Sequence, residues 1–81
     1  MEVGDIVTSL AGHDTNESFV VIAAVNDKFV LIADGKGRGM QNPKLKRIKH
    51  LRVVGKSGIN DPTNATLKKC LKKFNGTTKA Q

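Results

Sequence analysis

Two apolar runs separated by a short polar turn constrain the fold of this chain most strongly. Residues 19–25 have the sequence FVVIAAV and residues 28–33 the sequence KFVLIA, and Asn26 and Asp27 lie between them. β-Branched and aromatic residues favour strands, while Asn and Asp tolerate the positive φ of a tight turn. We therefore predict a β-hairpin. The apolar character is nearly continuous, so both faces of its strands should be covered, as in a small closed barrel.

Strand signals also lie on either side of the hairpin. Residues 3–10 hold the apolar side chains of a first strand. Residues 44–54 have apolar side chains at a spacing of three and then at a spacing of two. We interpret them as two short strands with a kink near Lys49 and His50. The intervening residues 34–43 include three glycines and a proline, which predicts a mobile, exposed loop.

One amphipathic helix is predicted near the C-terminus. Asp61 and Pro62 suit the N-cap and the first helical position, and Gly76 suits a C-terminal stop. Four apolar residues recur at i, i+3, i+4 and i+7, and therefore share one helix face. These residues are Leu67, Cys70, Leu71 and Phe74.

These signals divide the chain into three parts. Residues 1–56 are expected to form the barrel, residues 57–76 a loop and the basic helix, and residues 77–81 a disordered tail. The fold class is therefore mainly β, a small β-barrel with one C-terminal α-helix. A domain of this length buries roughly 60% of the surface of its unfolded chain, so it has little room for a deep catalytic cleft.

The cysteine content and the hydropathy of the chain indicate a cytoplasmic protein. Cys70 is the single cysteine, so no internal disulfide can form, and a reducing compartment is expected. The N-terminal residues lack a basic segment followed by a long apolar run, and no stretch approaches the length of a membrane span. We expect neither a membrane association nor a zinc site.

The residues that could carry catalysis do not form a recognised motif. The two histidines are His13 and His50, and no Ser or Cys nucleophile motif accompanies either of them. Asp14 and Glu17 fall in a polar loop, where carboxylates are usually solvated. Cys70 falls on the apolar face of the predicted helix, where a small core residue is expected. We predict no enzyme activity and no cofactor, and we keep a small enzyme as a minor alternative.

Charge is distributed very unevenly along the sequence. Residues 1–35 hold one basic and six acidic residues, a balance of −5, whereas residues 36–81 hold 13 basic residues and one acidic residue, a balance of +12. Such an asymmetry suggests a face that binds a polyanion. The alternative is that the charge serves solubility alone.

Seven cations within 17 positions form the candidate interface. Several cations on one rigid face suit phosphate recognition, because Arg makes bidentate contacts and Lys acts as a point charge. The alternative is a solvated edge strand that lysines protect from aggregation. The three Phe residues fall in apolar patterns, so recognition of the shape and backbone of folded RNA fits better than base stacking. The seven cations are Lys36, Arg38, Lys44, Lys46, Arg47, Lys49 and Arg52.

The predicted helix carries a second set of lysines outside its apolar face. Lysines at i and i+4 repel one another, and an anionic partner would relieve that repulsion. An ordinary solvated face and a membrane-surface helix are the alternatives. A possible secondary RNA contact is therefore assigned to Lys68, Lys69, Lys72 and Lys73.

Part of the sequence resembles a known family. Residues 4–12, GDIVTSLAG, resemble the opening of a KOW motif, with a glycine, Gly12, after the first strand. The segments DGKGR and PKLKRIKHLRV extend the similarity to bacterial KOW-domain RNA-binding proteins and to large-subunit ribosomal KOW proteins. The similarity covers roughly residues 3–54. It implies an SH3-like β-barrel of about five strands that binds RNA, commonly ribosomal RNA.

The loop after Gly12 departs from the family pattern. Many KOW loops continue with a lysine and a second glycine, whereas this chain continues with His13, Asp14, Thr15, Asn16 and Glu17. The loss of cations moves the expected RNA contact to the seven cations above. Gly12 is expected to let the loop turn tightly or approach RNA closely, and His50 either bonds RNA or braces the kink.

The sequence therefore predicts a cytoplasmic, monomeric, non-catalytic protein that binds structured RNA, with ribosomal RNA or the ribosome as its expected partner. The alternative is a module that docks on a protein of the translation or transcription machinery.

Overall fold

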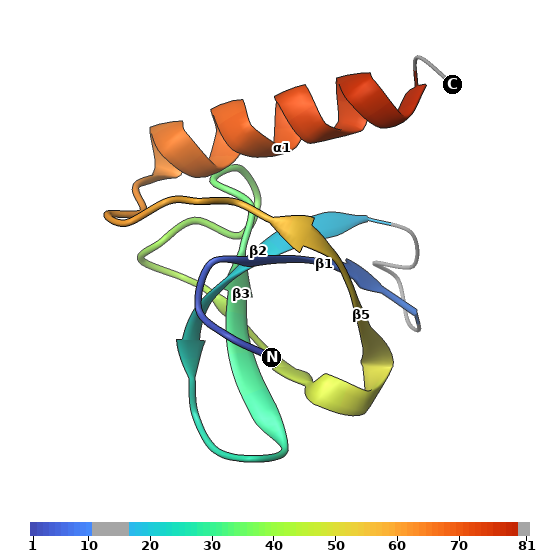
Figure 1. Cartoon of the computed structure of the whole chain (residues 1–81). Coiled ribbons are helices and arrows are strands. Elements are labelled where there is room, and N and C mark those ends of the chain that lie inside the picture. The colour runs from blue at the N-terminus through green and yellow to red at the C-terminus, as the bar shows by residue number, and fades with distance from the viewer. Residues whose placement is uncertain (11–16, 80–81) are drawn as a thin grey trace.

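The structure is a computed structural model that describes residues 1–10 and 17–79, with side chains as far as Phe74. Five strands precede one α-helix (Figure 1). The helix is α1 (Asn64–Lys79), and a single 3₁₀ turn, η1 (Ile48–His50), joins the last two strands. The strands are β1 (Asp5–Ser9), β2 (Ser18–Ala24), β3 (Phe29–Ala33), β4 (Lys44–Arg47) and β5 (Leu51–Lys56).

The strands form one antiparallel sheet in the order β4-β3-β2-β1-β5. The predicted hairpin is confirmed as β2 and β3. Asn26 closes its turn, because its Oδ1 atom accepts hydrogen bonds from the backbone N–H groups of Lys28 at 2.8 Å and Phe29 at 2.9 Å. The predicted kink is also confirmed, as η1 between β4 and β5.

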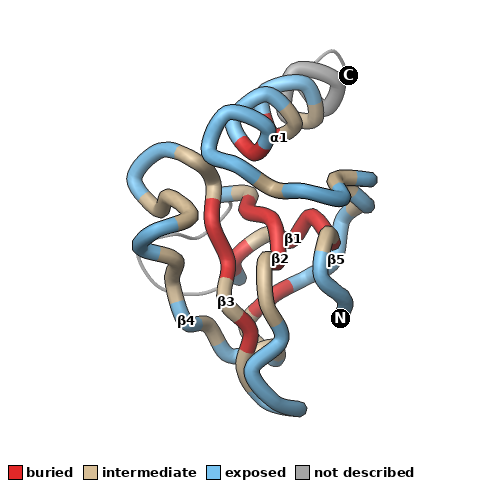
Figure 2. Tube along the Cα trace, turned by 90° about the vertical axis from the view of Figure 1, so that its left-hand side faces the viewer, coloured by how far each residue is buried: buried red, intermediate tan, exposed pale blue. Residues whose placement is uncertain are grey.

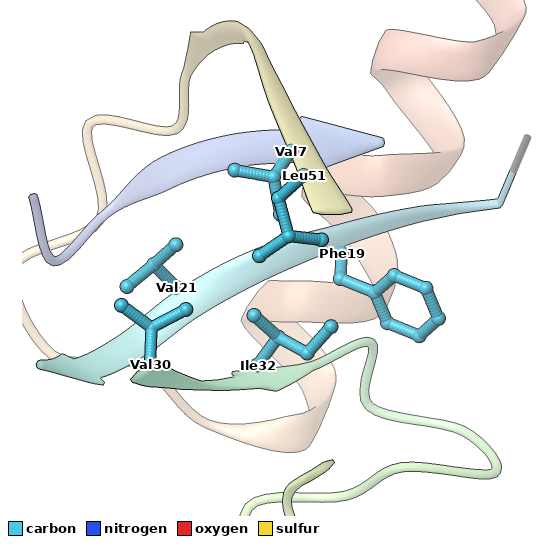
Figure 3. Packing of buried hydrophobic residues seen from close by; sticks show 6 residues of the cluster. All are labelled: Val7, Phe19, Val21, Val30, Ile32 and Leu51. Carbon is cyan, nitrogen blue, oxygen red and sulfur yellow. The ribbon is translucent and has the colours of Figure 1, made fainter. Parts of the chain in front are cut away.

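The inner face of the sheet encloses the first apolar cluster (Figure 3). Leu51 of β5 and Ile32 of β3 belong to the same cluster although β1 and β2 lie between their strands, so the sheet is strongly curved. β4 and β5 occupy its two edges and form no ladder with each other, so the sheet is not closed. The members of the cluster are Val7, Phe19, Val21, Val30, Ile32 and Leu51.

The outer face of the sheet is covered by α1 (Figures 1 and 2). Leu67 and Leu71 are buried against Ile6, Val20 and Ala33, and the half-buried Cys70 and Phe74 pack beside them, as their spacing predicts. Both faces of the hairpin strands are therefore covered, one by the curvature of the sheet and the other by the helix.

Both ends of α1 differ from the predicted ends. Thr63 rather than Asp61 caps the helix: the N–H of Thr66 donates to Thr63 Oγ1 at 3.2 Å, and the N–H of Thr63 donates to Thr66 Oγ1 at 2.7 Å. This reciprocal pair satisfies two N–H groups that the helix itself leaves unbonded. At the other end the helix does not stop at Gly76 but continues to Lys79.

The loop between β3 and β4 is tied to α1, which corrects the prediction of a mobile loop. Asp34 Oδ1 accepts hydrogen bonds from the N–H groups of Lys36 at 2.8 Å and Arg38 at 3.0 Å. The N–H of Met40 donates to Asn64 Oδ1 at 2.6 Å. Gly35 has φ +80°, and a Cβ atom there would meet the backbone carbonyl of Asn64. The loop and the first turn of the helix are therefore one packed unit.

Replacement of Gly35 by alanine tests this packing. We expect Gly35→Ala to lower the free energy of unfolding by about 1–3 kcal/mol, because an L side chain is strained at positive φ and its Cβ would push α1 from the sheet. Urea unfolding followed by circular dichroism measures the effect. Gly37→Ala is the matched control, since no atom lies within 4 Å of its Cβ position, and it should change stability by less than about 0.5 kcal/mol. Equal stability of the two variants would contradict the prediction.

Candidate nucleic-acid interface

The seven cations singled out in the sequence do not share one face of the structure. Lys36 and Arg38 belong to the loop that packs on the N-terminal end of α1, where Lys36 is exposed and Arg38 is half-buried. The other five follow β4, η1 and the start of β5. The expectation of a single basic face is therefore wrong.

The register of β4 separates its own cations as well. Lys44 pairs with Ile32 and Lys46 with Val30, so both half-buried lysines lie on the inner side of the sheet. Leu45 and Arg47 are on the opposite side, and Leu45 is 54% exposed. Leu45 is thereby separated from Ile48 and Leu51, which share its spacing of three but pack in the first apolar cluster. The physical reason for this separation is that the pairing of β3 with β4 decides which side chains of β4 face the core.

Arg47 is held beside Phe29 on the outer side of the sheet. The two residues are paired across β3 and β4, and the Arg47 Cζ atom lies 5.3 Å from the centroid of the Phe29 ring. Such a cation–π contact fixes the guanidinium without neutralising its charge. Arg47 remains exposed and can still donate hydrogen bonds to an anion.

The backbone around η1 places the β2–β3 turn beside the segment of β4, η1 and β5 that carries the remaining cations. The N–H of Ile48 donates to the carbonyl of Lys28 at 2.9 Å, and the carbonyl of His50 accepts from the N–H of Leu10 at 2.9 Å. These bonds attach η1 to the β2–β3 turn and to the end of β1. We call the resulting group of exposed cations the η1 surface: Lys28, Arg47, Lys49 and Arg52.

Lys28 is the member of the η1 surface that sequence reasoning missed. It is the one base in the acidic first part of the chain, so the charge balance hid it. The predicted hairpin placed Lys28 at a turn, but only the bond from Ile48 places that turn beside η1. His50 is half-buried and contributes its backbone carbonyl to the kink.

The η1 surface keeps most of its charge exposed to solvent. Lys28, Lys49 and Arg52 form no ion pair with any residue that the structure describes. The one acidic neighbour in the β2–β3 turn is Asp27, which is itself exposed. An anion approaching this surface therefore meets ammonium and guanidinium groups that do not first have to leave a carboxylate partner.

A second group of cations lies on and beside α1. Lys36 stands at its N-terminal end, next to Gly35, whose Cβ position is 3.1 Å from the backbone nitrogen of Lys68. All of these lysines are exposed. We call this group the α1 surface: Lys36, Lys68, Lys69, Lys72 and Lys73.

An open groove of about 440 Å³ runs between α1 and the end of β5. Cys70 and Phe74 supply its apolar floor, and Lys56, Lys69 and Lys73 line it as well. Gly55 lets the Phe74 ring of α1 approach β5 closely, because a Cβ atom at Gly55 would lie 3.3 Å from that ring.

Lys56 differs from the other lysines because carboxylates hold it. Its Nζ atom lies 2.9 Å from Asp5 Oδ1 and 3.8 Å from Glu2 Oε2. The N–H of Glu2 also donates to Asp5 Oδ2 at 2.8 Å. This backbone hydrogen bond first, and then the bond and charge of Lys56, lower the pKa of Asp5 below 3.8, while Asp5 raises the pKa of Lys56. Lys56 is therefore a structural cation more than a free binding group.

The described residues bring together no metal-ligand set and no membrane helix. They contain no group of three or more His, Cys, Asp or Glu side chains that could hold a metal ion. No helix among them has the length and hydropathy needed to cross a membrane. Gly12, His13 and Asp14 lie outside the described residues.

The geometry thus defines a small, mainly β domain with one covering helix and two cationic surfaces. Comparison of the sequence with models of known protein families and with curated proteins finds no match. The function is therefore argued from the surfaces themselves.

Removal of the Asp5 carboxylate tests the ion pair. The lowered pKa of Asp5 means that its contribution to stability is present above pH 3.8 and is lost as the pH falls through its folded-state pKa. We expect Asp5→Asn to lower the free energy of unfolding at pH 7 by about 1 kcal/mol and to flatten the loss of stability below about pH 4. Chemical unfolding at several pH values measures both effects. Glu2→Gln, at a site whose side chain is 81% exposed, should change little, and an acid limb equal in wild type and Asp5→Asn would refute the assignment.

Proposed function

We propose that this protein is a non-catalytic RNA-binding protein that contacts the phosphate backbone of structured RNA, with ribosomal RNA as the first candidate. The observation that carries the proposal is the η1 surface, where four exposed cations from the β2–β3 turn, β4, η1 and β5 stand on a hydrogen-bonded frame. A rigid group of cations suits phosphates, because little side-chain and backbone freedom is lost on binding.

The proposal favours RNA of defined shape over unstructured strands. Base-stacking platforms need exposed aromatic rings, whereas Phe19 is buried, Phe29 lies against Arg47, and Phe74 of α1 packs against Gly55. Cations without such rings recognise the backbone and the shape of a folded nucleic acid.

The order of elements also supports the proposal. Five antiparallel strands with a 3₁₀ turn between the fourth and the fifth are compatible with an SH3-like barrel, the fold that the resemblance to KOW proteins implies. We propose that residues 1–56 are a barrel of this type, working as a cytoplasmic monomer without a cofactor. The helix α1 would then be an addition to the barrel.

A protein-interaction module is the second candidate, and one apolar patch favours it. Leu45 is paired with the half-buried Leu31 on the outer side of the sheet, beyond the part that α1 covers. β4 is also an edge strand, and the edge that faces away from β3 could pair with a strand of a partner protein. A protein of the translation or transcription machinery would be the partner in this case.

A charge-reversal variant of the η1 surface tests RNA binding. We expect the triple variant Lys28→Glu, Lys49→Glu and Arg52→Glu to lose at least about tenfold in affinity for purified ribosomal RNA, because three phosphate contacts become repulsive. The slope of log K against log salt should fall by about 2–3, at about 0.7–0.9 per phosphate contact. Fluorescence anisotropy at several salt concentrations measures both quantities.

A charge-preserving variant is the matched control for this experiment. The substitutions Lys28→Arg, Lys49→Arg and Arg52→Lys keep every charge, and should leave the salt slope unchanged. Circular dichroism checks that both variants are folded. Affinity and salt slope that stay at wild-type values in the Glu variant would refute the η1 surface as the RNA site. No RNA binding by the wild type, together with co-purification of a protein partner after nuclease treatment, would favour the second candidate.

A further inference from the structure

The two cationic surfaces lie at opposite ends of the molecule. In both views α1 crosses one end of the domain, and η1 and the β2–β3 turn lie at the other, with the curved sheet between them (Figures 1 and 2). The Cα trace extends 34 × 25 × 21 Å along its principal axes. The η1 surface and the α1 surface are therefore separate features.

The packing of α1 fixes the direction in which its lysines face. Leu67 and Leu71 are buried against the sheet, so the helical repeat of 100° per residue places Lys69 and Lys72 on the far side of the helix, with Lys69 towards the groove beside β5. Lys68 and Lys73 flank them on the two sides. The whole uncovered side of the helix, from residue 68 to residue 73, is thus cationic. Lysines four positions apart repel one another here, and bound phosphates would relieve this repulsion.

Asp27 adjoins Lys28 in the η1 surface and is exposed, whereas three other described carboxylates are engaged within the fold. Glu2 and Asp5 are engaged with Lys56, and Asp34 is engaged with two N–H groups of its own loop. Screening at physiological ionic strength acts over about 8 Å, which is short compared with all three extents of the domain. Each surface therefore attracts an anion independently of the other.

The two surfaces are also rigidly connected. α1 is attached to the sheet through Leu67 and Leu71, through the close approach of Asn64 to Gly35, and through Phe74 against Gly55. Once one site is occupied, the second site meets a raised local concentration of its ligand only if the two segments of the partner are separated by a matching distance.

We propose that the protein bridges two segments of RNA, one held by the η1 surface and the other by the α1 surface. This inference rests on the proposed RNA-binding function and extends it from one contact to two. The partner is two phosphate backbones, from two RNA molecules, brought to opposite ends of one small domain.

Energy transfer between two RNA molecules tests the bridge. One preparation of a short RNA hairpin carries a donor dye and a second preparation carries an acceptor dye, and the two are mixed in equal amounts. Added wild-type protein should produce energy transfer that rises while RNA exceeds protein. The signal should then fall when protein is in excess, because each RNA acquires its own protein molecule. Fluorescence anisotropy follows binding to single RNA molecules in parallel.

Variants of the α1 surface separate bridging from binding. The triple variant Lys68→Gln, Lys69→Gln and Lys72→Gln removes three exposed charges while keeping good helix formers. We expect it to retain anisotropy-detected binding through the η1 surface and to lose the energy transfer. The matched variant Lys68→Arg, Lys69→Arg and Lys72→Arg should keep both signals.

Three outcomes would overturn the bridge. Energy transfer that persists in the Gln variant would place the second contact elsewhere or in a protein dimer, which sedimentation of the protein without RNA would detect. Binding of wild type to RNA without any energy transfer would leave the proposed function intact and remove the bridge. The absence of anisotropy-detected binding would refute the proposed function itself.

Discussion

The close approach of α1 to the outer face of the sheet decides how the rest of this small domain is arranged. Burial of Leu67 and Leu71 contributes about 1.5–3 kcal/mol for each side chain, but only if the helix can come near enough. Two glycines permit this, since Gly35 meets the backbone of Asn64 and Gly55 meets the ring of Phe74. The same contact covers an apolar face that the open sheet would otherwise expose, and it directs the lysines of α1 towards solvent.

Local patterns in the sequence were sufficient to predict the elements of this fold. The hairpin, the kink between two short strands and the apolar face of α1 each depend on residues close together in the chain, and each is present in the structure. The predicted N-cap of α1 was wrong because Asp61 followed by Pro62 matches a common sequence signal for a helix start. The reciprocal bonds of Thr63 and Thr66 depend on a less distinctive spacing of two hydroxyl groups.

The arrangement of the cations could not be predicted, since it depends on strand register and on contacts between distant segments. The pairing of Leu31 with Leu45 turns Leu45 outwards and Lys46 inwards, and no pattern within residues 44–47 alone reveals this. The bond between Ile48 and Lys28 joins parts of the chain 20 positions apart. The density of charge along the sequence therefore identifies the basic region, but it does not show that its cations lie at two different ends of the molecule.

The uneven charge of the sequence acquires a structural explanation in the two turns of the sheet. Asp34 organises the β3–β4 loop by accepting two N–H bonds, and Asp5 holds the N-terminal segment and Lys56, so these carboxylates are occupied inside the architecture. At the β2–β3 turn a neutral amide, Asn26, accepts the equivalent bonds. A carboxylate in that position would add a second negative charge, beside Asp27, to the turn that carries Lys28, and would further weaken the attraction of the η1 surface for phosphate. Asn26 therefore closes the turn without adding a negative charge beside the cations of the η1 surface.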